Sequence, residues 1–345
     1  KDGEGPVWLT KEEIDASFNY GVEKAVSMIA DQLRSTGHSR IGVVFATHNS
    51  ISVDLGIKLM EEHGLAQREA GNERLWVTNG AAGSIAYLVS DWLHSRYSLP
   101  QPKLIDASPE RDPATAARVL RQAWGLGEKP IANLIKLLEA KGIRVFSLAE
   151  NTKNVDAFSC WRNDEPFIFL NTFKTTERSR FDAAHELGHL VLHKHGGSNQ
   201  GPQAESEANA FASSFLMPRA DVISEMPRVQ SLRQILHGKK RWGVSAAALT
   251  YRLHKLGLIT DWQYRTFNIQ IRTNFGSSEP DSMVRETSTL WKMVLEDLWA
   301  QKLTRADIAR ELNIPHEELE NLLFGLTAST DQPPQKTGKP IFSIV

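Results

Sequence analysis

Residues 180–193 read RFDAAHELGHLVLH, with two histidines four residues apart. On a helix this spacing places His185 and His189 on one face, one turn apart, with Glu186 beside them. Two neutral imidazoles can supply two of the three protein ligands of a tetrahedral zinc, whose fourth position holds water. A carboxylate next to them can take a proton from that water. The stretch therefore predicts a zinc site with Glu186 as catalytic base.

The helix is supported independently of the histidines. Thr175 or Thr176 can cap its start and Glu177 lies in its first turn. Apolar residues then recur every three or four positions: Phe181, Ala184, Leu187, Gly188, Val191 and Leu192. Two histidines and a glutamate are costly to bury in such a helix without a partner, so we favour the metal site over a solvated His/Glu face.

The third protein ligand has to come from elsewhere. His193 continues the same face, but on an unbroken helix it would lie about 12 Å along the axis from His185, too far to share one ion. A second helix, expected over residues 204–218, offers two glutamates. Glu207 borders its apolar face and is the better candidate, whereas Glu205 points elsewhere and is expected to be a first-turn partner of the helix dipole.

The HELGH motif, the EAN-x-FA motif at 207–212 and Leu-Met-Pro at 216–218 resemble the ImmA/IrrE family of bacterial metallopeptidase domains. The resemblance implies that His185, His189 and Glu207 hold zinc and that Glu186 is the catalytic base. It also implies a helix beside the zinc site, for which residues 246–257 are the candidate. Tyr251 or His254 on this helix could then donate to the oxyanion of the tetrahedral intermediate.

The resemblance covers residues 112–258. Helices are expected at 113–126 and 131–141, and strands at 143–148, 155–160 and 166–171. The predicted class is α+β: a mainly helical, zincin-like peptidase domain over 112–225 with a small three-stranded sheet. A helical extension at 226–275 is expected to pack on it, and the basic residues at 239–241 are read as a solvated face rather than a phosphate-binding patch.

Composition bounds the function classes. The chain has 345 residues, a formal net charge of -1 and 41% hydrophobic residues, so no global field favours nucleic acid or a membrane surface. The sequence lacks a run of about 18 apolar residues and a signal-peptide core, so we expect no membrane span. The single cysteine, Cys160, suits a reducing cytoplasm.

Residues 1–78 do not fit the peptidase pattern. A strand at 40–46, a helix at 51–64 and a second strand at 74–77 would form one βαβ unit. Its Ala-Thr-His-Asn turn at 46–49 resembles part of the barrel of fungal-type proline dehydrogenase, a flavoenzyme. Such a barrel needs eight units, so we expect a fragment without flavin. Residues 79–111 are expected to form a helix, at 81–97, and a proline-containing linker.

Residues 285–326 are expected to form a helical module that resembles a helix-turn-helix. Its would-be recognition helix at 315–323 carries three glutamates and no lysine or arginine, so direct nucleic-acid binding is not expected. A packing or partner-docking role fits better. The tail at 327–345 is expected to be disordered.

The leading hypothesis is a zinc-dependent endopeptidase of the ImmA/IrrE type. The resemblance implies a regulatory protein as substrate, such as a DNA-binding repressor or an antitoxin, in a stress or phage response. The alternative is a non-catalytic regulatory or toxin-antitoxin module with a structural or vestigial zinc site. The presence of Glu186 favours the enzyme.

Overall fold

The computed structural model describes residues 23, 24, 27, 73–107, 112–148, 157–194, 201–276, 278–327 and 343–344. The chain divides into two units, residues 1–89 and 90–345, and the boundary falls inside helix α3 (Glu73–Arg96). The strand expected at 74–77 is wrong, because these residues lie in α3. A short apolar run such as Leu75-Trp76-Val77 does not by itself distinguish strand from helix. The strand expected at 40–46 and the helix at 51–64 lie outside the described residues.

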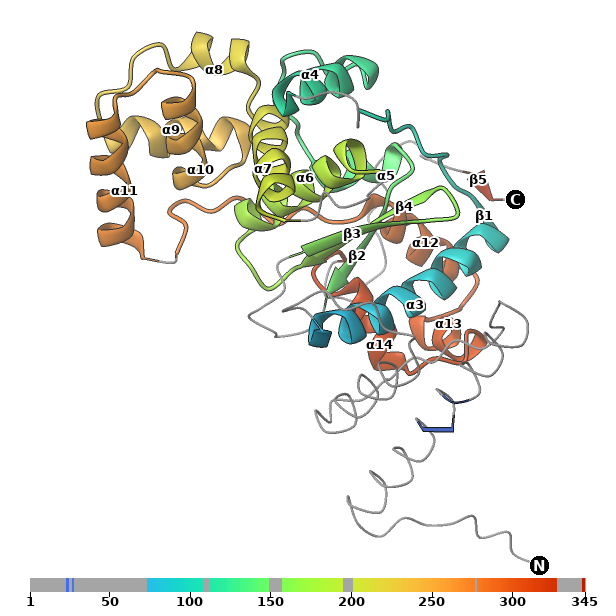
Figure 1. The fold of residues 1–345 in the computed structure, drawn as a ribbon. Coiled ribbons are helices and arrows are strands. Elements are labelled where there is room, and N and C mark those ends of the chain that lie inside the picture. The colour runs from blue at the N-terminus through green and yellow to red at the C-terminus, as the bar shows by residue number, and fades with distance from the viewer. Residues whose placement is uncertain are drawn as a thin grey trace, which may run out of the picture. The chain divides into compact units, whose positions relative to one another are not determined.

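A three-stranded mixed sheet forms the centre of the second unit, as Figure 1 shows. Its strands are β2 (Arg144–Leu148), β3 (Ala157–Arg162) and β4 (Glu165–Asn171), in the order β2-β4-β3. β4 pairs parallel with β2 and antiparallel with β3. The three expected strands are thus confirmed, and β3 is an edge strand.

A two-residue turn joins β3 to β4. Asn163 and Asp164 both have positive φ, 50° and 61°, as a type I′ hairpin turn requires. Asparagine and aspartate tolerate this conformation better than most residues. The turn fixes the register, in which Ser159 faces Ile168 and Trp161 faces Pro166.

The two faces of the sheet are covered by different parts of the chain. Val145, Ile168 and Leu170 belong to one large core that includes the apolar side of α6 (Thr176–Leu192). The alternate residues face the other way: Phe146 contacts Phe167, Phe169 and Trp291 of α12 (Thr289–Ala300) through its ring. Because strand side chains alternate, the sheet has one aliphatic and one aromatic face, and both faces are buried.

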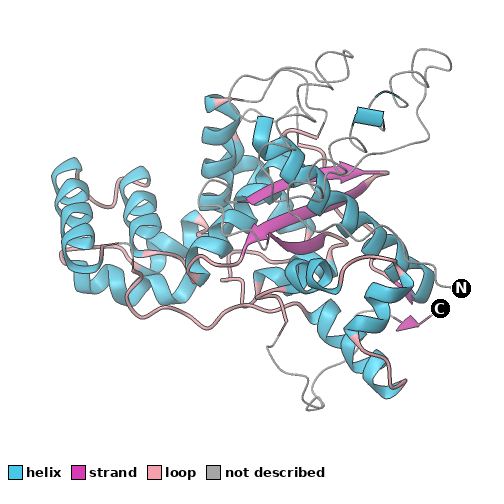
Figure 2. Ribbon diagram, turned by 90° about the horizontal axis from the view of Figure 1, so that it is seen from below, coloured by secondary structure: helices cyan, strands magenta, loops and turns pink. Residues whose placement is uncertain are grey.

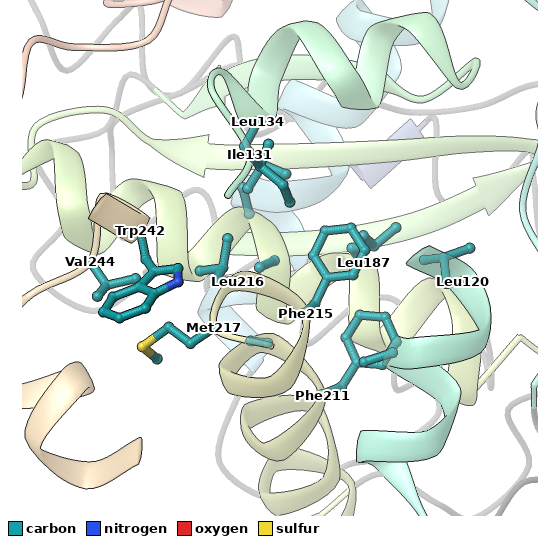
Figure 3. Packing of buried hydrophobic residues seen from close by; sticks show 14 of the residues in the cluster. Leu120, Ile131, Leu134, Leu187, Phe211, Phe215, Leu216, Met217, Trp242 and Val244 are labelled. Carbon is teal, nitrogen blue, oxygen red and sulfur yellow. The ribbon is translucent and has the colours of Figure 1, made fainter. Parts of the chain in front are cut away.

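Helix α6, which carries the HELGH motif, packs closely against α7 (Pro202–Leu216). Gly188 permits this approach, because a Cβ there would lie 3.1 Å from the ring of Phe211 and 3.2 Å from the Cα of Ala208. Leu187, Phe211 and Phe215 meet in the resulting core (Figure 3). Thr175 is the N-cap of α6, but its side chain makes no capping hydrogen bond, contrary to the expected cap.

Six further helices complete the peptidase domain and its extension. α4 (Pro113–Ala123) packs on α7, and α5 (Leu134–Ala140) packs on α6 and β2. α8 (Arg219–Glu225) follows α7. α9 (Leu232–Trp242), α10 (Ala246–Lys255) and α11 (Asp261–Phe275) then form a helical group that in Figure 1 lies on the far side of α7 from the sheet. The Ser245 side chain caps α10, as expected from the sequence.

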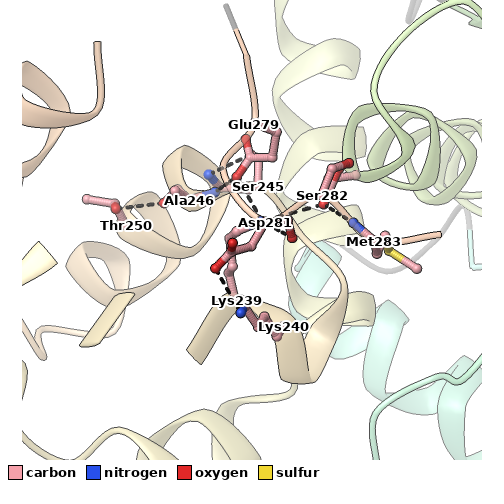
Figure 4. Close-up of polar contacts among 11 residues, drawn as sticks. Lys239, Lys240, Ser245, Ala246, Thr250, Glu279, Asp281, Ser282 and Met283 are labelled. Carbon is pink, nitrogen blue, oxygen red and sulfur yellow. Dashed lines mark hydrogen bonds and ion pairs between the residues drawn. The ribbon is translucent and has the colours of Figure 1, made fainter. Parts of the chain in front are cut away.

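The segment that follows α11 is tied to the peptidase domain by polar contacts (Figure 4). Glu279 accepts from the backbone N–H of Ala246 and pairs with the buried Lys239 at 3.1 Å. Glu177, in the first turn of α6, accepts from the hydroxyl of Ser282 and from the N–H of Met283, each at 2.8 Å. Buried charges satisfied by several partners hold this segment in one place.

The C-terminal module consists of α12, α13 (Arg305–Glu311) and α14 (His316–Leu323). α14 packs on β2 and α12 on α5, so the module covers the aromatic face of the sheet. Figure 2 shows helices on both sides of the strands. Within the tail, Ser343–Ile344 form β5, which pairs with β1 (Tyr97–Ser98). The tail was expected to be disordered, and for these two residues that expectation is wrong. Within the described ranges, no helix combines the length and apolarity needed to cross a bilayer.

Candidate metal centre

The two histidines of the HELGH motif converge on one point with a carboxylate from α7. His185 Nε2 and His189 Nε2 are 3.0 Å apart. Glu205 brings one carboxylate oxygen to 3.1 Å from His185 Nε2 and the other to 3.4 Å from His189 Nε2. Among the described residues, these three form the single group of histidine, cysteine or acidic side chains with metal-site spacing.

The carboxylate at this point is not the one expected from the sequence. Glu207 lies instead against His193, with Oε2 at 3.0 Å from Nε2. Residues two apart on a helix point about 200° from each other, so only one of Glu205 and Glu207 can face the histidine pair. The assignment of Glu207 as a metal-site carboxylate is therefore wrong for this structure, and so is the interpretation of Glu205 as a dipole partner only.

Asn209, four positions after Glu205, shows which face of α7 is turned to the histidine pair. Asn209 lies on the same side of the helix and places Oδ1 3.1 Å from His185 Nδ1. An amide oxygen there accepts the Nδ1–H, which leaves the Nε2 lone pair of His185 free for a metal. The i,i+4 spacing of Glu205 and Asn209 was the sequence signal for this face, and it was missed.

The second histidine has a different set of neighbours. His189 Nδ1 lies 3.1 Å from His193 Nδ1, on the opposite side of the ring from Nε2. Burial and the two neighbouring imidazoles lower the pKa of His189 to about 4. His189 is therefore a neutral imidazole at neutral pH, which is the form that binds metals. As expected, His193 lies outside the group formed by the Nε2 atoms and Glu205.

Glu186 is buried beside this group and contacts the edge strand. Its Oε2 accepts a hydrogen bond of 2.7 Å from the hydroxyl of Ser159 on β3. Burial raises the pKa of Glu186 to about 8, an effect that the Ser159 hydrogen bond opposes and the charges of Glu205 and Asp182 reinforce. A carboxylate with a raised pKa is a better proton acceptor than an ordinary glutamate. No pattern in the sequence singled out Ser159 as a partner of Glu186.

The donor set suits zinc. Metal bonds of about 2.0–2.2 Å to two imidazole nitrogens and one carboxylate oxygen, in tetrahedral geometry, require donor atoms roughly 3.3 Å apart. The two Nε2 atoms are 3.0 Å apart, and Glu205 offers one oxygen 3.1 Å from His185 and its other oxygen 3.4 Å from His189. In donor type and in proximity, His185, His189 and Glu205 therefore fit the metal that the motif predicts.

The two expected oxyanion donors are not brought to the histidine pair. His254 Nε2 lies 2.6 Å from Asp261 Oδ1 of α11, and its ring stacks on Tyr264. Tyr251 is 41% exposed, with the ammonium of Lys255 over its ring. α10 packs on α9 and α11, and both side chains have their partners, Asp261, Tyr264 and Lys255, on α10 or α11.

Comparison with known proteins agrees with the site. Residues 138–254 match the family model described as the IrrE N-terminal-like domain, peptidase family M78. This range begins in α5 and ends in α10, so it includes the sheet, α6 and α7. No curated protein matches the chain. The domain that carries the histidine pair therefore belongs to the ImmA/IrrE family of metallopeptidases.

Proposed function

We propose that the protein is a zinc-dependent endopeptidase in which His185, His189 and Glu205 hold the metal and Glu186 is the general base. The observation that carries the proposal is the convergence of both Nε2 atoms and the Glu205 carboxylate. The buried carboxylate of Glu186 lies on the same helix, directly after His185. When bound, zinc supplies Lewis-acid polarisation of a carbonyl and activation of water.

Glu186 would perform the proton transfers. Its carboxylate accepts a proton from the attacking water and then donates this proton to the amine that leaves. The hydroxyl of Ser159 holds one carboxylate oxygen at 2.7 Å, so the other oxygen is the one directed to water. Asn209 and His193 keep the two ligand rings oriented.

A peptide is the substrate class that the neighbouring edge strand favours. Within the described residues β3 pairs with β4 alone, and its Ser159 contacts Glu186. An extended peptide can add to an edge strand as a further strand through its main-chain hydrogen bonds. Such pairing would present a main-chain carbonyl next to the base.

The family suggests which peptide. We propose a regulatory protein as substrate, a DNA-binding repressor or an antitoxin, and action in the cytoplasm during a stress response. The single cysteine, Cys160, supports the reducing compartment. Direct binding to nucleic acid is not proposed, because α14 presents glutamates where a recognition helix needs basic residues.

The test combines metal analysis with a cleavage assay. Purified protein should contain one zinc per chain, and co-expression with the products of neighbouring genes should yield a cleaved regulatory protein. Glu186→Gln should keep the zinc and abolish cleavage, because the amide cannot accept the proton. Glu317→Gln, which removes an exposed carboxylate of α14, should leave cleavage unchanged.

Three outcomes separate the hypotheses. Protein without zinc after purification and zinc addition would refute the metal site. Full cleavage by Glu186→Gln would refute the assigned base. Stoichiometric zinc with no cleavage of any neighbouring gene product would favour the non-catalytic regulatory module.

A further inference from the structure

We propose that His193 and Glu207 form a relay that holds His189 in the tautomer able to bind a metal, which makes both of them positioning residues. The inference rests on the proposed zinc site and concerns Glu207, which was predicted to be a ligand, and His193, which was not. In the structure they lie next to the ligand group and not in it. Their hydrogen bonds determine which ring nitrogen of His193, and which of His189, carries the proton.

The carboxylate of Glu207 determines which nitrogen of His193 carries a proton. Glu207 Oε2 is 3.0 Å from His193 Nε2, and a carboxylate can only accept. His193 Nε2 therefore carries the proton. In a neutral imidazole the other nitrogen, Nδ1, is then an acceptor.

The contact between His193 and His189 then determines the tautomer of His189. His193 Nδ1 lies 3.1 Å from His189 Nδ1, so the acceptor on His193 requires a donor on His189. With its proton on Nδ1, His189 has a bare lone pair on Nε2. That atom is the one 3.0 Å from His185 Nε2 and 3.4 Å from a carboxylate oxygen of Glu205.

The relay is anchored at both ends by backbone structure. His193 is the C-cap of α6, with only 10% of its side chain exposed. Glu207 lies in α7, and its other oxygen accepts from the amide of Gln203 at 2.9 Å. Hydrogen bonds of this kind behind a metal ligand typically change metal affinity by about 10–100-fold.

The two ligand histidines thus receive their orientation by different means. Asn209 accepts from His185 directly, through an amide oxygen on α7. His189 reaches α7 only through His193. Removing His193 should therefore affect one ligand and leave the other in place.

The first measurement reads the tautomer without any metal. In full-length protein with ¹⁵N-labelled histidine, long-range ¹H–¹⁵N correlation spectra distinguish Nδ1–H from Nε2–H imidazoles. His189 of the metal-free protein should be the Nδ1–H tautomer. In His193→Leu it should become a mixture or shift to Nε2–H, while His185 keeps its tautomer. Each ring is assigned by single substitution.

The second measurement is zinc affinity by competition with a chelator. His193→Leu should weaken zinc binding about 10–100-fold. His193→Asn should recover most of this loss, because its amide oxygen can take the place of Nδ1 as the acceptor. Glu207→Gln should cost only a few-fold, since its amide oxygen still accepts from His193. Ser206→Ala, at an exposed position of α7 next to Glu207, is the matched control and should be neutral.

A structural role alone predicts a different pattern. It would lower the melting temperature of His193→Leu and His193→Asn alike, with the tautomer of His189 unchanged, and this result would overturn the relay. An Nε2–H tautomer of His189 in the wild-type protein would overturn it as well. If wild-type protein fails to bind zinc but His189 shows the predicted tautomer and its dependence on His193, the relay stands and the proposed function fails.

Discussion

The hydroxyl of Ser159 lies 2.7 Å from Oε2 of Glu186 and 3.2 Å from the backbone carbonyl oxygen of the same residue. A side chain on the edge strand of the sheet thus contacts the proposed base at both its carboxylate and its peptide group. Since a carboxylate that accepts a hydrogen bond is stabilised in its charged form, the contact keeps the pKa of Glu186 lower than burial alone would set it.

Ser159→Ala should therefore impair catalysis without removing the metal. The loss of the donor raises the pKa of Glu186 further, so the acidic limb of the pH–rate profile should move to higher pH. It also frees the carboxylate to rotate. We expect a decrease in kcat of about tenfold, within the range for groups that assist general-base catalysis.

Ser147→Ala is the control for this substitution. Ser147 lies on β2, and its hydroxyl is 2.8 Å from that of Thr172 instead of being directed to Glu186. Zinc content should be the same in both variants. A Ser159→Ala enzyme with an unchanged pH–rate profile would show that the hydroxyl does not act on the base.

The choice between Glu205 and Glu207 gives a separate prediction. Glu205→Ala removes a proposed ligand and should reduce zinc affinity by more than a hundredfold, whereas Glu207→Gln should reduce it only a few-fold. Isothermal titration or chelator competition on the two variants ranks them. The reverse ranking would restore Glu207 as the ligand and reject the geometry of α7 found here.

Sequence periodicity was sufficient for the elements around the site and insufficient for its carboxylate. Short strand-like runs identified β2, β3 and β4, and the three- and four-residue spacing of apolar residues identified α6 and α7. The apolar residues of α7, however, predict only which side of the helix packs on the core and not which glutamate faces the histidine pair. Glu205 and Glu207 point to different sides of α7, and which of them meets the histidine pair depends on how α7 lies across α6.

Contacts distant in sequence account for the other differences. The Leu75-Trp76-Val77 run reads equally well as strand or helix, and it lies within the 24 residues of α3. Periodicity also cannot say that α12 covers a sheet formed by residues more than a hundred positions earlier. Such packing depends on complementary surfaces that no local pattern encodes.

Glu139 shows how the C-terminal module is joined to the peptidase domain. Its carboxylate accepts from the hydroxyl of Ser288 and from the N–H groups of Thr289 and Leu290, at the first turn of α12. Burial nevertheless raises the pKa of Glu139 from 4.5 to about 7. The folded state therefore binds this proton more tightly than the unfolded state, and stability falls as the pH rises from about 4.5 to about 7.

Glu139→Gln should remove this dependence. Relative to the variant, the wild-type protein should lose on the order of 3 kcal/mol of unfolding free energy between pH 4.5 and 7, with no further change above that pH. Urea unfolding of both proteins across the range measures the difference, in which the contributions of all other groups cancel. A difference that is independent of pH would mean that Glu139 stays charged in the folded protein.

The aromatic face of the sheet predicts that the C-terminal module stabilises the peptidase domain. Trp291 is 1% exposed, and its ring centroid lies 6.4 Å from that of Phe146 on β2. Trp291→Ala should lower the unfolding free energy by about 3–5 kcal/mol, because it leaves a cavity between α12 and the sheet. Trp299→Ala, on the same helix but 48% exposed, should change it by less than about 0.5 kcal/mol.

Chemical denaturation monitored by circular dichroism compares the two variants, and loss of zinc should accompany unfolding in a single transition. A Trp291→Ala variant in which α12–α14 unfold first while zinc stays bound would show that the module is only attached to the peptidase domain and does not complete its core.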